Sequence, residues 1–185
     1  MPVSDLSVPL PNWLNEDQLP ANVEPAVHDW LFDQGSLTRR LTALAEGAFS
    51  VEPLLEGWQV LRDDECKALG VPSHSQGWVR EVYLRGHGQP WVFARSVAPR
   101  SALEASGFDL AQLGSRSLGE LLFSDSAFRR DVIEVCLYPA PFLPLEVRRA
   151  LLWGRRSCFR RDRLGVLVAE VFLPRLWRAA GVEAV

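Results

Sequence analysis

The stretch GWVREVYLR (residues 77–85), followed by GHGQ (86–89) and PWVFARSV (90–97), decides the fold of this chain. Both outer runs are rich in aromatic and β-branched residues, a composition typical of strands. The segment between them contains two glycines, which readily adopt the positive φ angles that a tight hairpin turn requires. The stretch therefore predicts two antiparallel strands joined directly by a turn.

A second hairpin is predicted near the other end of the chain, where residues 153–161 and 164–173 meet at Asp162-Arg163 and Pro174 ends the second run. Hairpins with helices in the connections predict an α+β fold, built on a single mainly antiparallel sheet of about six strands. The remaining elements are predicted as strands over residues 49–61 and 128–138, and as helices over residues 24–32, 36–47, 63–69, 117–123 and 145–152.

Length and composition indicate one folded domain. The chain has 185 residues, of which 48% are hydrophobic and 23% are charged, as in ordinary globular proteins. Residues 1–22 are proline-rich and polar, and we expect a loosely ordered arm there. Residues 23–185 are expected to form the single domain.

Several classes of function are disfavoured by the sequence. The net charge of −3 argues against nucleic-acid binding, and no run approaches the ~20 apolar residues of a membrane span. The three cysteines and three histidines show no metal-binding or redox spacing. We therefore expect a cytoplasmic, reduced, monomeric protein without a bound metal and without stable membrane insertion. An arginine-rich segment, residues 148–163, is interpreted as a solvated strand face and turn.

Three charged residues lie within apolar, strand-like runs. Arg80 alternates with Trp78 and Val82, and Glu170 is surrounded by valine, leucine and phenylalanine. Arg95 lies in the partner strand of the first hairpin, where both arginines could face the same side. A buried charge costs several kcal/mol unless it is paired, which leaves two interpretations. Glu170 forms an ion pair with Arg80 or Arg95, or these residues line an enclosed pocket for an anion.

Seven segments, in order along residues 27–174, resemble the chorismate lyase family of bacterial ubiquinone synthesis. They are DWL (29–31), GSLTRR (35–40), WVREV (78–82), PWVFARSVAP (90–99), LGELLF (118–123), LWGRRS (152–157) and EVFLP (170–174). The resemblance implies an enzyme that converts chorismate to 4-hydroxybenzoate and pyruvate without metal or organic cofactor. It also implies helical flaps that close over an internal ligand site.

The resemblance assigns roles to five residues of this chain. Arg80 would bind the ring carboxylate of chorismate, and Glu170 would bind the ring hydroxyl and assist proton transfer. Leu37 and Leu118, near two predicted helix starts, would wall the ring, and free backbone N–H groups there could meet a carboxylate. Arg95 would support the second anion or the pocket. We therefore predict that Arg80 and Glu170 line one pocket, separated by about the length of a benzoate ring.

Two other functions stay open on the sequence. The first is a non-catalytic domain that binds a small aromatic acid, because the effector domains of one class of transcription regulators resemble chorismate lyase in fold. Residues 1–35 are too few and too acidic for the DNA-binding domain expected in such a regulator. The second is an interaction protein that uses its tryptophans and arginines at a surface, which gives no reason for Glu170 within an apolar run.

Overall fold

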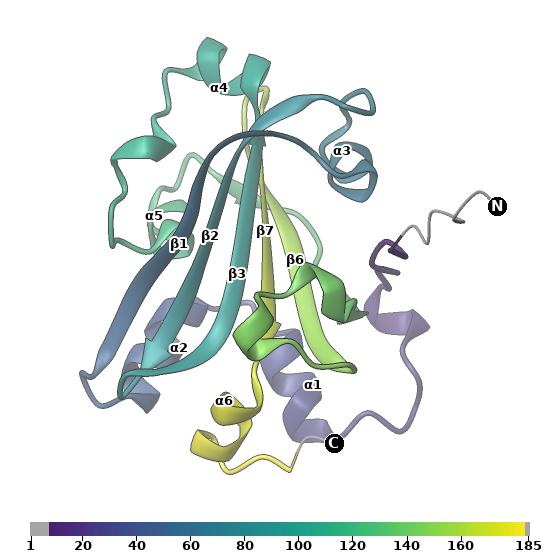
Figure 1. Ribbon diagram of the computed structural model, residues 1–185, viewed down its shortest axis with the longest axis vertical. Coiled ribbons are helices and arrows are strands. Elements are labelled where there is room, and N and C mark those ends of the chain that lie inside the picture. Colours follow the sequence, from purple (N-terminus) through teal and green to yellow (C-terminus); the bar gives the residue numbers. More distant parts are fainter. Residues whose placement is uncertain (1–7, 184–185) are drawn as a thin grey trace, which may run out of the picture.

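The centre of the molecule is one antiparallel sheet, seen in a computed structural model that describes residues 8–183 (Figure 1). Its strands run in the order β1-β2-β3-β7-β6-β4, and β5 also pairs with β6. The predicted α+β class is confirmed, with seven strands because the run predicted over 128–138 divides into β4 and β5. The bounds are β1 Phe49–Val60, β2 Gln76–Gly86, β3 Gln89–Pro99, β4 Arg129–Arg130, β5 Glu134–Tyr138, β6 Leu152–Arg161 and β7 Leu164–Phe172.

The predicted hairpin of residues 77–97 forms as β2 and β3, and its register contains an irregularity. His87 and Gly88 both have positive φ, 49° and 73°, which matches the right-handed twist of the strands they join. Arg85 pairs with Pro90, but Leu84 pairs with Val92, so one residue of β3 is skipped. This β-bulge shifts the pairing of all later residues in the hairpin by one position.

Six α-helices occupy the connections and the C-terminal end of the described chain. Ser36 and Ser117, the first residues of two predicted helices, cap α2 and α5, each accepting a hydrogen bond from a backbone N–H in the first turn. Gly70 ends α3 in the left-handed conformation. The bounds are α1 Pro25–Leu31, α2 Leu37–Leu44, α3 Asp63–Leu69, α4 Arg100–Ser106, α5 Leu118–Ser124 and α6 Pro174–Ala179, with 3₁₀ turns at Glu16–Gln18, Leu110–Gln112, Ala140–Phe142 and Leu145–Val147.

The helix predicted over residues 145–152 is wrong. Only one 3₁₀ turn forms there, and β6 begins at Leu152. Leu145 is 78% exposed and Leu151 is 66% exposed, so a helix over this segment would bury little apolar surface against the sheet. Without such burial a short helix is marginal in water.

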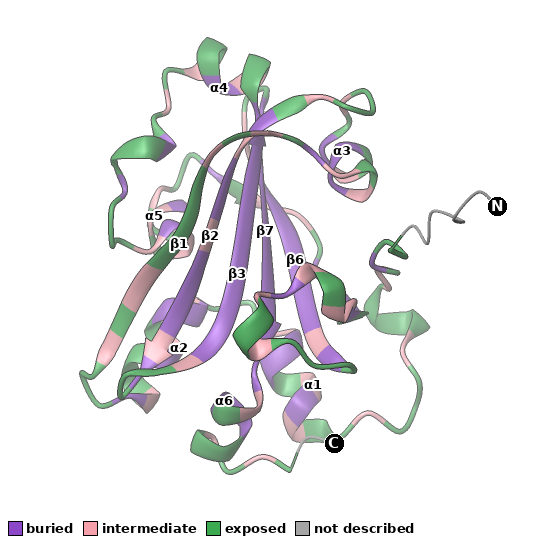
Figure 2. Ribbon diagram, in the orientation of Figure 1, coloured by how far each residue is buried: buried purple, intermediate pink, exposed green. Residues whose placement is uncertain are grey.

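Two groups of helices cover the two faces of the sheet (Figure 1). One face, here named the α2 face, packs against α1, α2 and α6 at one end and against α4 and α5 at the other. The opposite face, here named the α3 face, packs against α3 and the segment that follows β5. The strands β3, β6 and β7 are therefore buried almost throughout, whereas the edge strand β1 is largely exposed (Figure 2).

Part of the expected N-terminal arm belongs to the packed domain. Leu14 forms a β-bridge with Val135, and the indole N–H of Trp13 donates to Asp64 at 3.1 Å. The aromatic ring of Trp13 thus finds a partner on α3 that a proline-rich composition does not predict. Residues 1–7 of the expected arm lie outside the described residues. Among residues 8–183, no helix has the length and apolar character needed to cross a membrane.

Candidate active site

A row of polar side chains crosses the α2 face at the middle of the sheet. Residues that pair directly across antiparallel strands point to the same face. Arg80 pairs with Ser96, Ser96 with Val168, and Val168 with Ser157. In the neighbouring row, Ala94 pairs with Glu170, and Glu170 with Arg155. Arg80 and Glu170 therefore share one face, as predicted.

A small cavity, partly open to solvent, lies on this face, between the sheet and the first turns of α2 and α5. Its free volume is about 20 Å³, which holds about one water molecule. Polar groups from the sheet and helix residues meet there. The lining consists of Gly35, Ser36, Leu37, Thr38, Gly119, Phe123, Arg130, Arg155, Ser157, Phe159, Val168 and Glu170.

Glu170 is held in a buried ion pair with Arg155. The Nε of Arg155 donates to Oε2 of Glu170 at 2.8 Å. Its Nη1 donates to the carbonyl oxygens at the end of α1, those of Trp30 and Leu31, and to that of Asp33 at 3.0 Å. The ion pair considered from the sequence does exist, but its partner is neither Arg80 nor Arg95.

Arg155 is a site residue that the sequence interpretation missed. The arginine-rich segment was assigned to a solvated surface, yet Arg155 is 1% exposed and its neighbour Arg156 is 8% exposed. Both arginines are buried because helices or loops cover each face of β6. The sequence did contain an indication that Arg155 is buried. LWGRRS forms the first part of the strand that pairs with the apolar run around Glu170.

The first turns of α2 and α5 meet at the cavity. The hydroxyls of Thr38 and Ser117 lie 2.7 Å apart and share a hydrogen bond. The backbone N–H groups of Leu37, Thr38, Leu118 and Gly119 donate to no described residue. Leu37 lines the cavity, whereas Leu118 packs into the apolar cluster around α5 and its neighbour Gly119 takes the lining position. First-turn backbone N–H groups that have no hydrogen-bond acceptor within the protein can bind an anion.

The turn before α2 is fixed by Asp33. Its carboxylate accepts from the N–H of Gly35 at 2.8 Å and from Arg40 at 2.9 Å. Burial by itself raises the pKa of Asp33, but these hydrogen bonds outweigh it and hold the pKa below its usual value. The charged form of Asp33 therefore anchors the chain that enters the cavity.

Arg80 is buried on the α2 face beside the cavity and does not belong to its lining. Its Nη1 contacts Glu56 on β1, and its Nη2 donates to the carbonyl oxygens of Gly114 at 2.8 Å and Arg116 at 2.9 Å. Burial lowers the pKa of Arg80, and the charge of Glu56 opposes this. The prediction that Arg80 and Glu170 line one pocket is not met here, because the loop before α5 covers Arg80.

Arg95 points away from this site, onto the α3 face. It pairs across the hairpin with Glu81, not Arg80, so the prediction that both arginines face the same side is wrong. The physical reason is the β-bulge, because a regular hairpin continued from the Gly86–Gln89 pair would have placed Arg95 opposite Arg80.

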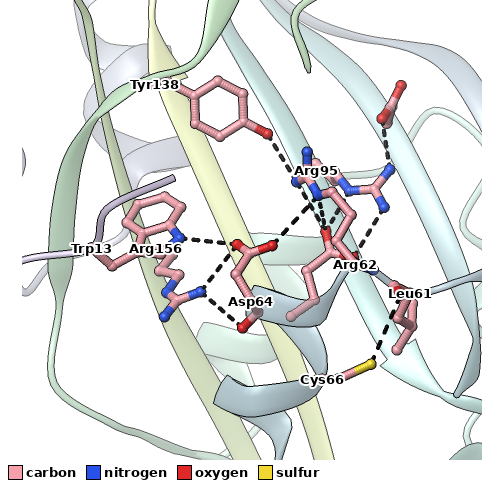
Figure 3. A network of polar contacts seen from close by, with 10 residues as sticks. Trp13, Leu61, Arg62, Asp64, Cys66, Arg95, Tyr138 and Arg156 are labelled. Atoms are coloured by element: carbon pink, nitrogen blue, oxygen red, sulfur yellow. Dashed lines mark hydrogen bonds and ion pairs between the residues drawn. The ribbon is translucent and has the colours of Figure 1, made fainter. Parts of the chain in front are cut away.

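On the α3 face Arg95 is the centre of a buried charge network (Figure 3). Its Nε and Nη2 donate to the two carboxylate oxygens of Glu65 at 2.6 and 3.1 Å, and its Nη1 donates to Glu81 at 2.8 Å. Arg62 contacts the same Glu65 and the hydroxyl of Tyr138. Burial opposes the charge of Arg95, but the two glutamates outweigh it and raise its pKa. With both glutamates bound, Arg95 has its Nε and both Nη groups engaged within the protein.

Comparison with known proteins agrees with the segments quoted above. Residues 10–182 match the family model described as chorismate lyase. The chain belongs to the chorismate lyase family. It is 75% identical over 173 residues to a probable chorismate pyruvate-lyase of Pseudomonas aeruginosa, covering 94% of this chain and 97% of that protein. It is 66% identical over 171 residues to the protein of the same description from Pseudomonas putida, covering 92% of each. The resemblance inferred from the sequence is confirmed, and this family member is an enzyme.

Solved structures of other proteins share the fold. The C-terminal domain of PhnF superposes with a TM-score of 0.54 at 16% identity, over 71% of this chain and 87% of that one. The possible transcriptional regulator YydK of Bacillus subtilis superposes with a TM-score of 0.51 at 9% identity, over 70% and 60%. At such identities the likeness is one of fold alone. The regulator-like alternative is therefore not favoured over the family to which this enzyme belongs.

Proposed function

We propose that this enzyme eliminates pyruvate from chorismate and releases 4-hydroxybenzoate, as the first committed step of ubiquinone synthesis. The observation that carries the proposal is a buried carboxylate with one free oxygen in a small cavity. Arg155 occupies Oε2 of Glu170, and Oε1 makes no hydrogen bond to a described residue. That oxygen is available to a ring hydroxyl or to a proton in transit.

The proposed reaction is balanced without an external reactant. The ether C–O bond between the ring and the enolpyruvyl group breaks, and the ring carbon that bears the hydroxyl loses its hydrogen as a proton. The ring becomes aromatic, and the enolpyruvate takes up a proton to give pyruvate. No atom is oxidised by an outside agent, so we propose that the enzyme acts without a cofactor. Its contribution is orientation, proton transfer and exclusion of water.

The ring carboxylate is proposed to bind at the far end of the ring from Glu170, where the first turns of α2 and α5 meet. Four backbone N–H groups are free there, and Leu37 and Leu118 would wall the ring. Arg80 would also bind the ring carboxylate. It would give up its hydrogen bonds to the carbonyl oxygens of Gly114 and Arg116 and donate to the carboxylate instead. The exchange is favourable because a carboxylate forms stronger hydrogen bonds with a guanidinium than a neutral carbonyl does.

The cover over the cavity must move for this chemistry to occur. A volume of about 20 Å³ excludes a ring bearing two carboxylates. The loop that holds Arg80 leads directly into α5, so displacement of that loop would free Arg80 and enlarge the cavity together. The helical cover thus supports the flap expected from the family.

The function is tested by mixing the purified protein with chorismate and following 4-hydroxybenzoate by its ultraviolet absorbance, with and without a chelator. We expect product in both cases, and pyruvate in equal amount in a coupled assay. Absence of product would overturn the proposal. If 4-hydroxybenzoate then still raised the melting temperature, a binding function would replace it. We also propose a cytoplasmic monomer, for which sedimentation velocity supplies the measurement of mass.

A further inference from the structure

Three charged side chains line the cavity, and only two of them neutralise each other. Glu170 and Arg155 form an ion pair, as described above. Arg130 is the third, and within residues 8–183 no carboxylate lies at ion-pair distance from it. The buried arginines near the sheet centre are compensated, Arg80 by Glu56 and Arg95 by two glutamates, whereas Arg130 is only partly buried.

Arg130 is held with its hydrogen-bonding fork free. It lies on β4 opposite Phe159, and its Nε donates to the hydroxyl of Ser157 at 2.8 Å. Its guanidinium carbon lies 5.4 Å from the centre of the Phe159 ring. Its two Nη groups donate to no described residue. A planar guanidinium fixed at Nε and open at both Nη groups is suited to bind a carboxylate through two hydrogen bonds.

The charge of Arg130 is also poorly stabilised in the absence of ligand. Burial lowers its pKa, and the charge of Arg155 lowers it further, while Glu170 and Asp33 act in the opposite direction. A bound anion would relieve both effects, because it would supply the negative charge that this part of the cavity lacks.

The connectivity of chorismate decides which of its two carboxylates Arg130 can bind. The ring carboxylate lies across the ring from the hydroxyl, whereas the enolpyruvyl ether is attached to the carbon next to the hydroxyl. If Glu170 binds the hydroxyl, the enolpyruvyl carboxylate must lie near Glu170. Arg130 lies near Glu170, because it is hydrogen-bonded to Ser157. Ser157 is two residues along β6 from Arg155, the ion-pair partner of Glu170.

We infer that Arg130 binds the carboxylate of the enolpyruvyl group, the one that leaves with pyruvate, and that it contributes nothing to binding the carboxylate retained by 4-hydroxybenzoate. This inference rests on the proposed function. During the reaction the leaving group gains negative charge as the ether bond breaks, and a guanidinium at its carboxylate stabilises that charge. Arg95, which was expected to support the second anion or the pocket, faces the opposite side of the sheet.

The test compares Arg130→Gln with Arg129→Gln, its exposed neighbour on β4, which loses the same charge outside the cavity. For Arg130→Gln we expect kcat/KM for chorismate to fall by roughly 10- to 100-fold. The dissociation constant of 4-hydroxybenzoate, measured by titration calorimetry, should change by less than about 3-fold. Arg129→Gln should leave both values unchanged. Arg130→Lys keeps the charge without the fork and should recover part of kcat/KM.

The possible outcomes separate this inference from the proposed function. Equal losses in kcat/KM and in product affinity would overturn it, because Arg130 would then bind the ring carboxylate or shape the cavity. Unchanged kcat/KM in Arg130→Gln would overturn it as well. If Arg130→Gln does not fold, Arg130→Lys must show the same split between substrate and product. Failure of the unaltered enzyme to form product would instead refute the proposed function.

Discussion

Glu170 has one carboxylate oxygen bound by Arg155 and one free in the cavity. Replacement by glutamine keeps an acceptor for Arg155 but removes the capacity to take a proton. We therefore expect Glu170→Gln to lower kcat by about 10²- to 10⁴-fold while the enzyme stays folded. Steady-state assays with chorismate, together with a melting curve, give the measurement.

The matched control for this prediction is Glu134→Gln. Glu134 also pairs with a buried arginine of β6, Arg156, but on the other side of that strand from Glu170. The Glu134→Gln variant should have an unchanged kcat. Wild-type turnover in Glu170→Gln would mean that this carboxylate binds the hydroxyl without transferring a proton.

Glu65 contributes pH-dependent stability on the α3 face. Burial opposes its charge, but Arg95 and Arg62 outweigh burial and lower its pKa below the usual 4.5. A carboxylate whose pKa is lowered by folding stabilises the protein above its unfolded-state pKa, and this stabilisation is lost as the pH falls through the folded-state pKa. Glu65→Gln should cost about 1–3 kcal/mol at neutral pH, because Arg95 and Arg62 each lose a charged hydrogen-bond partner and keep only their remaining ones.

Urea unfolding at several pH values tests the pH-dependent stabilisation by Glu65. The difference in free energy of unfolding between the unaltered protein and Glu65→Gln should be largest near neutral pH and should shrink below about pH 4. Glu104→Gln, in an exposed pair with Arg100, should change the free energy of unfolding by less than about 0.5 kcal/mol. A difference that stays constant with pH would contradict the role given to Glu65.

At the scale of the elements, the β2–β3 hairpin shows how one extra residue redirects side chains. The bulge skips Trp91 in the pairing with β2, and the Trp91 ring packs directly over Gly86. A Cβ at Gly86 would lie 2.3 Å from carbons of that buried ring. The glycine is therefore required for the ring to lie there, independently of the freedom of its backbone.

Gly86→Ala should consequently destabilise the protein by about 1–3 kcal/mol and lower its melting temperature by roughly 2–12 °C. The control is Gly154→Ala on β6, where the nearest atoms to an added Cβ lie at 3.5 Å, an ordinary contact. Differential scanning calorimetry of both variants gives the comparison. Equal melting temperatures for the two would show that the Trp91 ring moves at no cost.

At the scale of the whole molecule, charged side chains lie on both faces of the sheet, in two adjacent rows that run across the strands. One row holds Glu81, Arg95 and Arg156 on the α3 face, and the adjacent row holds Glu170 and Arg155 on the α2 face. Apolar clusters lie on either side of this level on each face. The charges on the α3 face are paired with one another, whereas the α2 face keeps an uncompensated arginine and a small cavity.

The small free volume of that cavity predicts slow product release. Because the free volume holds about one water molecule, the cover must open in every turnover to release 4-hydroxybenzoate. Rapid mixing of enzyme with excess chorismate should give a burst of product, close to one equivalent per enzyme, followed by a slower steady state. Linear progress from the first turnover would contradict this.

Local patterns in the sequence were sufficient to predict the α+β class, both hairpins, the starts of α2 and α5, and the charged residues Arg80 and Glu170 within apolar strands. These features depend on local patterns, such as turn glycines, capping serines and charges within apolar runs. The motifs of the sequence also determined the family. The tertiary structure alone decided which charges meet. A one-residue bulge, which no local pattern marks, put Arg95 and Arg80 on opposite faces, and the register of β6 against β7 placed Arg155 beside Glu170. Pairing partners depend on strand register and on the helices covering each face, so they are fixed only when the whole sheet is assembled.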